Sequence, residues 1–159
     1  MNYIESYFNL KVGYKDLYLF YNPELNGEEV SAEKLFYAVS GDVDLVFAAL
    51  NIMPNKSGYQ FWKDAIYLYL LQYKKKINLS IDIYPLIEKK YQTTLMCVDR
   101  AMRRCFENVL YFASKHDENY VCAYLKNNIL FPHNSEIIAK LVELISSKKF
   151  QEKKIKLAF

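Results

Sequence analysis

Three arginine side chains lie within five positions of one segment, at Arg100, Arg103 and Arg104. At about 100° per residue of an α-helix, they share one face with Met96 and Cys97. A guanidinium group can donate two parallel hydrogen bonds to O6 and N7 of a guanine, or bind phosphate oxygens. The spacing predicts a helix face that contacts nucleic acid. The candidates for contact with base edges are the residues of this face and the neighbouring acid: Met96, Cys97, Asp99, Arg100, Arg103 and Arg104.

Two amphipathic helices joined by a short polar turn would position this face. The first, Ser80–Tyr91, places apolar residues at i, i+3, i+4 spacing, and Gln92 and Thr93 then break the pattern. Thr94 can act as the N-cap of a second helix that continues through Ala113. Its inner face would consist of Val98, Met102, Cys105, Val109, Phe112 and Ala113. This layout is typical of a helix-turn-helix whose second helix, over about 94–113, enters a DNA major groove.

The charge of the chain is concentrated in the same region. Residues 1–57 carry four Lys and eight acids (−4), residues 58–116 carry ten Lys or Arg and five acids (+5), and the remainder carries seven Lys and five acids (+2). A phosphate-binding surface requires such a basic excess, and the candidates are Lys89, Lys90, Thr94 and Lys115. The alternative is a basic face that is merely solvated, with Met96 packed on a neighbouring helix.

Other kinds of site find little support in the sequence. Cys97, Cys105 and Cys122 lack metal-ligand spacing, and His116 and His133 complete no zinc pattern. The sequence contains no phosphate-binding loop and no nucleophile elbow, so we expect neither an enzyme nor a cofactor. No signal peptide and no membrane span is apparent, and we expect reduced thiols and a cytoplasmic location.

The remaining segments predict a mainly α fold, a bundle of about six helices. We expect an aromatic N-terminal extension (1–40) with a small β-hairpin in 1–22 and a short helix, a helix-turn-helix domain (41–149), and a basic tail (150–159) that frays. A helix starting at Ser31 should stop near Gly41, and Asp42 should cap the next one. Further helices are expected over 59–73, 117–126 and 134–147.

Three segments in this order resemble a known family. They are GYQFWKDAI, IYPLIEKKYQTTLMCVDRAMRRCFENVLYFA and PHNSEIIAKLVELI, and together they cover roughly residues 42–147. They are similar to the C-terminal DNA-binding effector domain of the stage-zero sporulation master regulator of endospore-forming bacteria. The resemblance implies an all-α bundle of six helices with a helix-turn-helix. It also implies that Asn134 and Ser135, at a helix start, meet a DNA phosphate.

Two departures from the family pattern alter these expectations. The family's phosphorylatable receiver domain would not fit into the roughly 40 residues before the similar region, which predicts a free-standing paralogue. Its N-terminal segment either covers the helical core or forms a dimerisation or partner-binding surface. Met96 and Cys97 also replace a Ser and an Arg that would contact DNA, so we expect a different or weaker preferred site.

Two functions follow from this pattern. The first is a transcriptional regulator that binds double-stranded DNA in a sequence-specific manner. The second is a protein-interaction module that modulates a full-length sporulation regulator or another partner without reading DNA itself. We expect no membrane partner. A homodimer and association with a full-length regulator both remain open. A redox role of Cys97, near a helix N-terminus and Arg100, is a further hypothesis.

Overall fold

The structure is a computed structural model and describes residues 32–72 and 76–157 of the 159-residue chain. Every regular element in these ranges is helical, which confirms the mainly α prediction. The elements are α3 (Ala32–Ala49), α4 (Tyr59–Leu71), the π-helical turn η1 (Leu79–Ile83), α5 (Tyr84–Tyr91), α6 (Leu95–Cys105), α7 (Val109–Lys115), α8 (Tyr120–Asn128), α9 (Asn134–Ser146) and α10 (Lys148–Leu157). The predicted β-hairpin lies outside the described residues.

Helix α4 is the central support of the bundle. It contacts α3, α5, α6 and α9, and most of its residues are buried. The rings of Phe47 from α3, Trp62 from α4 and Phe106 pack together, with centroid distances of 4.9 Å between Trp62 and Phe106 and 5.7 Å between Phe47 and Phe106. Because large aromatic side chains bury much apolar area, this cluster ties α3 and α4 to the end of α6.

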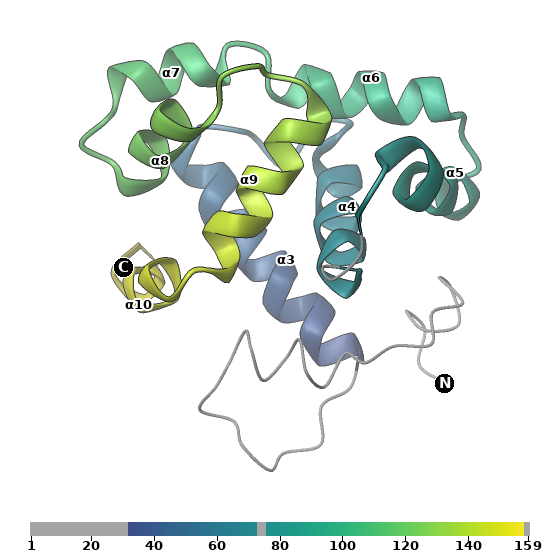
Figure 1. Ribbon diagram of the computed structural model, residues 1–159, viewed down its shortest axis with the longest axis horizontal. Coiled ribbons are helices and arrows are strands. Elements are labelled where there is room, and N and C mark those ends of the chain that lie inside the picture. Colours follow the sequence, from purple (N-terminus) through teal and green to yellow (C-terminus); the bar gives the residue numbers. More distant parts are fainter. Residues whose placement is uncertain (1–31, 73–75, 158–159) are drawn as a thin grey trace.

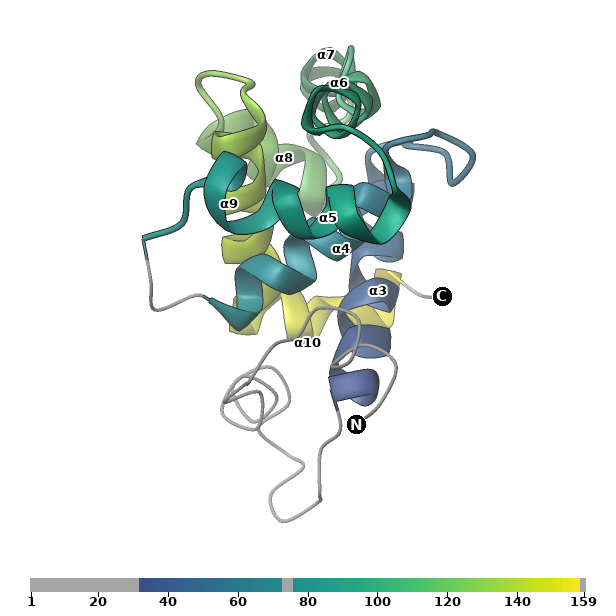
Figure 2. The ribbon, with the colours of Figure 1, turned by 90° about the vertical axis from the view of Figure 1, so that its right-hand side faces the viewer.

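Helices α6 and α7 lie end to end along one edge of the molecule, as two perpendicular views agree (Figures 1 and 2). The sequence predicted one continuous helix through Ala113, and this prediction is wrong. The backbone N–H of Phe106 donates to the Arg103 carbonyl, so the last turn of α6 tightens. Asn108 then adopts a left-handed conformation with φ 64° before α7 begins. The apolar period continues across this break, which explains why periodicity alone did not reveal it.

The predicted stop near Gly41 is also wrong, because α3 runs without interruption through this residue. Gly41 is exposed, and a methyl group there would meet no atom within 4 Å. Asp42 is not a cap. Its carboxylate is nearly buried, accepts a hydrogen bond from Gln151 at 3.0 Å and lies 3.6 Å from the Lys154 ammonium. Packing against the C-terminal helix thus outweighs the low helix propensity of glycine.

The tail that the sequence predicted to fray forms α10 instead. Phe150 is fully buried, and α10 contacts both α3 and α9. The Ser147 hydroxyl accepts a hydrogen bond from the Phe150 backbone N–H and so caps the first turn. The buried ring, this cap and the contacts of Gln151 and Lys154 with Asp42 hold a segment whose composition is otherwise strongly basic.

No helix in the described part of the chain has the length and apolar character needed to cross a membrane.

Candidate nucleic-acid interface

The turn between α5 and α6 has the geometry of a helix-turn-helix. Gln92 ends α5 in a left-handed conformation with φ 51°, and the Thr93 N–H donates to the Glu88 carbonyl. The Thr94 side chain then accepts a hydrogen bond from the Cys97 N–H at 3.2 Å. The predicted N-cap is therefore confirmed.

The inner face of α6 approaches α4 so closely that only glycine fits at residue 58. A Cβ atom at Gly58 would lie 2.2 Å from the Ala101 carbonyl oxygen and 2.8 Å from the Met102 nitrogen. Both neighbours are backbone atoms of α6, so the clash could not be relieved by the movement of a flexible side chain. Gly58 therefore sets the distance between α6 and the bundle.

Trp62 fixes the same end of α6 by a hydrogen bond. Its indole N–H donates to the Met102 carbonyl at 2.8 Å in the buried core. Val98, Met102 and Cys105, which the sequence assigned to the inner face, are all buried. This predicted face of α6 is confirmed, and it holds the backbone in one place.

The outer face of α6 is open to solvent. Met96 is 66% exposed, and Cys97, Arg100, Arg103 and Arg104 are also exposed. Within the described residues, the guanidinium groups of Arg100 and Arg104 form no ion pair. The outer face therefore presents two guanidinium groups without an ion pair among the described residues, beside the apolar side chain of Met96.

Asp99 occupies the boundary between the two faces and has several partners inside the protein. It forms an ion pair with Arg103 one turn further along α6. The Tyr84 hydroxyl donates to its carboxylate at 3.1 Å, and the Asn134 amide donates to the same oxygen at 3.2 Å and to the Asp99 carbonyl at 3.1 Å. These contacts join α5, α6 and α9 through three side chains far apart in the sequence.

This network changes the interpretation of two predicted site residues. Asn134 is buried, and its amide is directed into the network. Asp99 uses its oxygens on Tyr84, Arg103 and Asn134. Both residues therefore hold α6 against α5 and α9 through these bonds. Burial raises the pKa of Tyr84 to about 12, with the Asn134 bond acting in the opposite direction and the nearby Asp99 charge in the same one.

Lys90 also proves to be part of the interior. Its ammonium lies 3.0 Å from the fully buried carboxylate of Asp64, which also accepts a hydrogen bond from the Tyr91 hydroxyl. Burial raises the pKa of Asp64, while the bonds from Tyr91 and Lys90 act in the opposite direction. Lys90 thus pairs α5 with α4. The neighbouring Lys89 is exposed at the end of α5 and remains a candidate for phosphate contact.

The remaining phosphate candidates lie on two sides of α6. Exposed Ser135 in the first turn of α9 lines a pocket of about 460 Å³ together with Arg103, Ser80 and His133. Exposed Lys115 lies in the last turn of α7, with its ammonium 5.4 Å from the centre of the Tyr111 ring. The structure therefore brings Ser135 and Arg103 together and places Lys115 apart from them.

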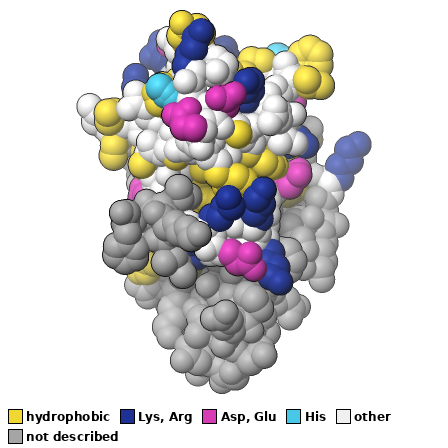
Figure 3. Space-filling model, turned by 90° about the vertical axis from the view of Figure 1, so that its left-hand side faces the viewer, with side chains coloured by type: hydrophobic (Ala, Val, Ile, Leu, Met, Phe, Trp, Pro, Cys, Tyr) yellow, Lys and Arg dark blue, Asp and Glu magenta, His cyan; other side chains and the backbone are white. Residues whose placement is uncertain are grey.

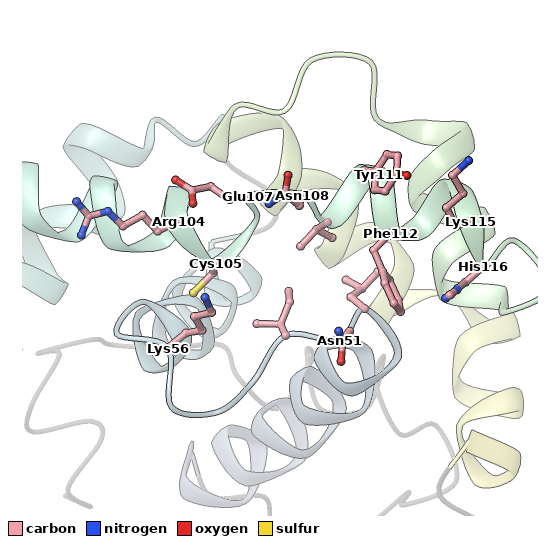
Figure 4. A pocket seen from close by; sticks show the side chains of 13 residues that line it. Asn51, Lys56, Arg104, Cys105, Glu107, Asn108, Tyr111, Phe112, Lys115 and His116 are labelled. Carbon is pink, nitrogen blue, oxygen red and sulfur yellow. The ribbon is translucent and has the colours of Figure 1, made fainter.

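A groove of about 470 Å³ runs beneath the junction of α6 and α7. Figure 4 shows Arg104 and Lys115 extending away from it at opposite ends, while Lys56 reaches toward Cys105. His116 stacks edge-on against Phe112, with centroids 4.2 Å apart. The labelled charged groups do not converge on one point of the groove (Figure 4).

The three thiols differ in their surroundings. Bonds to the hydroxyls of Thr94 and Thr93, with a smaller contribution from the Arg100 charge, lower the pKa of the exposed Cys97. Burial raises the pKa of Cys105 and Cys122. No group of three His, Cys, Asp or Glu that could hold a metal ion occurs among the residues described.

The side of the molecule that carries α7, α8 and α10 has a different character. Its basic, acidic and hydrophobic side chains are interspersed (Figure 3). On α6, by contrast, the outer face carries three arginines and one acid that is paired. The outer face of α6 is therefore the stronger candidate for an anionic partner.

Sequence reasoning missed the residues that hold α6 in position. Gly58 directly precedes the helix predicted over 59–73, and Gly58, Tyr84 and Asp64 were given no role. Gly58 stands at the N-cap of α4, where glycine is itself a common residue, so the local pattern gave no sign of the close approach of α6.

Comparison with known proteins agrees with this geometry. A family model described as sporulation initiation factor Spo0A C terminal matches residues 43–145, from α3 to the end of α9. No solved structure matches the chain. The family match spans the helix-turn-helix, its supporting helices and most of the sequence, and it confirms the resemblance inferred from the sequence. The chain therefore belongs to the family of the C-terminal domain of sporulation initiation factor Spo0A.

Proposed function

We propose that this chain regulates transcription by binding double-stranded DNA, with α6 in the major groove. The observation that carries the proposal is the contrast between the two faces of α6, one locked into the core and one exposed and cationic. A recognition helix needs both, because its backbone must keep a fixed position while its side chains reach the bases. Membership of a family of regulatory domains, rather than of enzymes, supports the same function.

Arg100 is the side chain best placed to read a base. It is exposed at the middle of α6 and has no ion pair within the described residues. Arg104 is equally uncommitted, whereas the pairing of Arg103 with Asp99 directs that guanidinium toward the start of α9. We assign Arg100 to a guanine. We assign Arg103, Ser135 and Lys89 to phosphates, because contacts to the sugar-phosphate backbone position a protein on DNA.

Selection of binding sites from a random duplex library tests the proposal. The wild-type chain should enrich one motif, and Arg100→Ala should relax that motif at a single position. Lys89→Gln should weaken binding to all sequences equally and reduce the steepness of the salt dependence, because one fewer counterion is released. No enrichment at low salt would contradict DNA reading.

A protein-interaction module is the second candidate, and a specific observation favours it. Leu130 and Phe131 are 81% and 65% exposed, and the Glu136 carboxylate accepts hydrogen bonds from both backbone N–H groups at 2.9 Å. The loop thus presents two apolar side chains on a braced backbone. The test measures binding of the chain to a full-length sporulation regulator. Loss of this binding in Leu130→Ser and Phe131→Ser, without any change in DNA binding, would support this function.

A further inference from the structure

Met96 is an apolar side chain placed in the middle of a polar recognition surface. It lies in the first turn of α6 and is 66% exposed, although the buried core takes up the other methionine of this helix, Met102. Met96 and Arg100 are four residues apart, so they point from the same face of the helix. Met96 therefore belongs to the outer face of α6, and most of its side chain is in contact with solvent rather than with the bundle.

The chemistry of Met96 restricts what it can recognise in a major groove. A thioether has no hydrogen-bond donor and accepts only weakly, so it cannot bind the polar edges of guanine, adenine or cytosine strongly. The one apolar group that a standard base presents in the major groove is the C5-methyl of thymine. Contact between the Met96 side chain and this methyl would remove both from water.

The backbone of α6 determines where this contact would fall. The Thr94 cap fixes the first turn, and Gly58 and Trp62 fix the other end, so the spacing of Met96 and Arg100 on the helix is constant. Four residues rise about 6 Å along an α-helix. A base-pair step is about 3.4 Å, so the two side chains reach bases within about two base pairs of each other.

Asp99 is not a competitor for the neighbouring base. Its carboxylate is bound by Tyr84, Asn134 and Arg103, and these contacts keep it on the protein side of the helix. The polar reader in this half of α6 is then Arg100, and the side chain one turn before it is Met96. The two differ in chemistry, so each selects a different base.

From these observations we propose that Met96 selects a thymine through its 5-methyl group, within about two base pairs of the guanine bound by Arg100. The inference rests on the proposed DNA-binding function and adds to it the class of base that the first turn of α6 recognises.

The experiment uses the full chain and the duplex enriched by site selection, with each thymine near the Arg100 position replaced in turn by uracil. Uracil keeps the pairing and the O4 acceptor and lacks only the methyl group. Fluorescence anisotropy should show about a fourfold loss of affinity at one thymine, as expected for burial of one methyl group. Met96→Ser should remove this difference between thymine and uracil, and Met96→Leu should retain it.

The control is Arg100→Gln, which should lose the preference for guanine and keep the difference between thymine and uracil. Circular dichroism should show unchanged folding for all three variants, because both residues are exposed. An enriched site at which no thymine shows a uracil penalty, or a penalty that survives in Met96→Ser, would overturn the role of Met96 and leave DNA binding intact. Absence of any enriched site would instead overturn the DNA-binding function, and the role of Met96 with it.

Discussion

The two faces of α6 differ in how many partners they have inside the protein. On the inner face, Gly58 and Trp62 meet α6 at its backbone, and Met102 is fully buried. On the outer face, Arg100 and Arg104 have no ion pair in the described part of the chain. The difference teaches that one short helix can keep the side chains that stabilise the fold separate from the exposed side chains that we propose contact DNA. Substitutions inside the bundle should therefore change unfolding, and substitutions on the outer face should change binding alone.

The largest effect is expected where a buried charge loses its partner. Lys90→Met leaves the fully buried Asp64 carboxylate without its ion pair, and should lower the free energy of unfolding by about 3–5 kcal/mol. Urea denaturation measures this change, and the matched control is Lys89→Met, which changes the adjacent, exposed lysine. Equal stability losses in the two variants would contradict the assignment of Lys90 to the interior.

The loss in Lys90→Met should also depend on pH. Burial raises the pKa of Asp64 in the folded state, and removal of Lys90 raises it further, so the folded state favours the protonated carboxyl. A carboxyl with such a raised pKa contributes stability to the folded state below its pKa in the unfolded chain, which is near 4. This contribution is lost as the pH rises toward the pKa of the carboxyl in the folded state. The gap between Lys90→Met and Lys89→Met should therefore be smaller near pH 4 than at pH 7.

Two glycines provide the next test. Gly58→Ala should destabilise the fold by about 3 kcal/mol, because the new methyl group meets the α6 backbone, and it should weaken DNA binding as α6 shifts. Gly41→Ala lies in an open part of α3 and should stabilise the fold by about 0.5–1 kcal/mol. Thermal unfolding of both variants measures the contrast. A neutral Gly58→Ala would show that the contact with α6 is not a constraint.

On the outer face, the expected change is in affinity alone. Arg100→Ala should weaken binding to the selected duplex by about 1–3 kcal/mol, or about 5- to 140-fold, and leave the melting temperature of the protein unchanged. Anisotropy titrations and a thermal melt of the same sample make the comparison direct. A large fall in melting temperature would mean that Arg100 contributes to folding, against the separation of the two faces.

The smallest effect concerns the thiols. Cys97 should react with iodoacetamide faster than Cys105 and Cys122, because it is exposed and its pKa is lowered, whereas both other thiols are buried. The rate of Cys97 labelling should reach half of its maximum below pH 9, which is the ordinary pKa of a cysteine thiol. Peptide mass spectrometry after timed labelling gives the three rates. Equal rates would remove the basis for a redox role of Cys97.

The sequence was most informative where local rules decide the structure. The cap at Thr94 and the buried positions Val98, Met102 and Cys105 follow from hydrogen-bonding chemistry and a 100° period, and both predictions are confirmed. The end of α6 was missed because Phe106 belongs to a ring cluster with Phe47, a contact across 59 positions of sequence that the local pattern does not contain.

Long-range pairing also explains what was missed at the site. Asn134 has the sequence signature of a helix start, and nothing near it indicates that its amide binds Asp99, 35 positions earlier. Lys90 lies at the end of a helix, where the macrodipole favours a positive side chain. Its partner Asp64 lies 26 positions away in the sequence. A residue type and its local spacing predict which face it occupies. They do not predict the partner it meets there.

The braced backbone of α6 has a consequence for how this sequence can diverge. The side chains at 96, 97, 100 and 104 are exposed and form no ion pair with any residue that the structure describes, whereas Gly58, Trp62, Tyr84 and Asn134 keep the helix in place from outside it. Four positions can therefore be rewritten with little effect on folding, and under the proposed DNA-binding function a few codon changes at these positions would give a new operator. The same four positions are the natural choice for a combinatorial library aimed at reprogramming this scaffold.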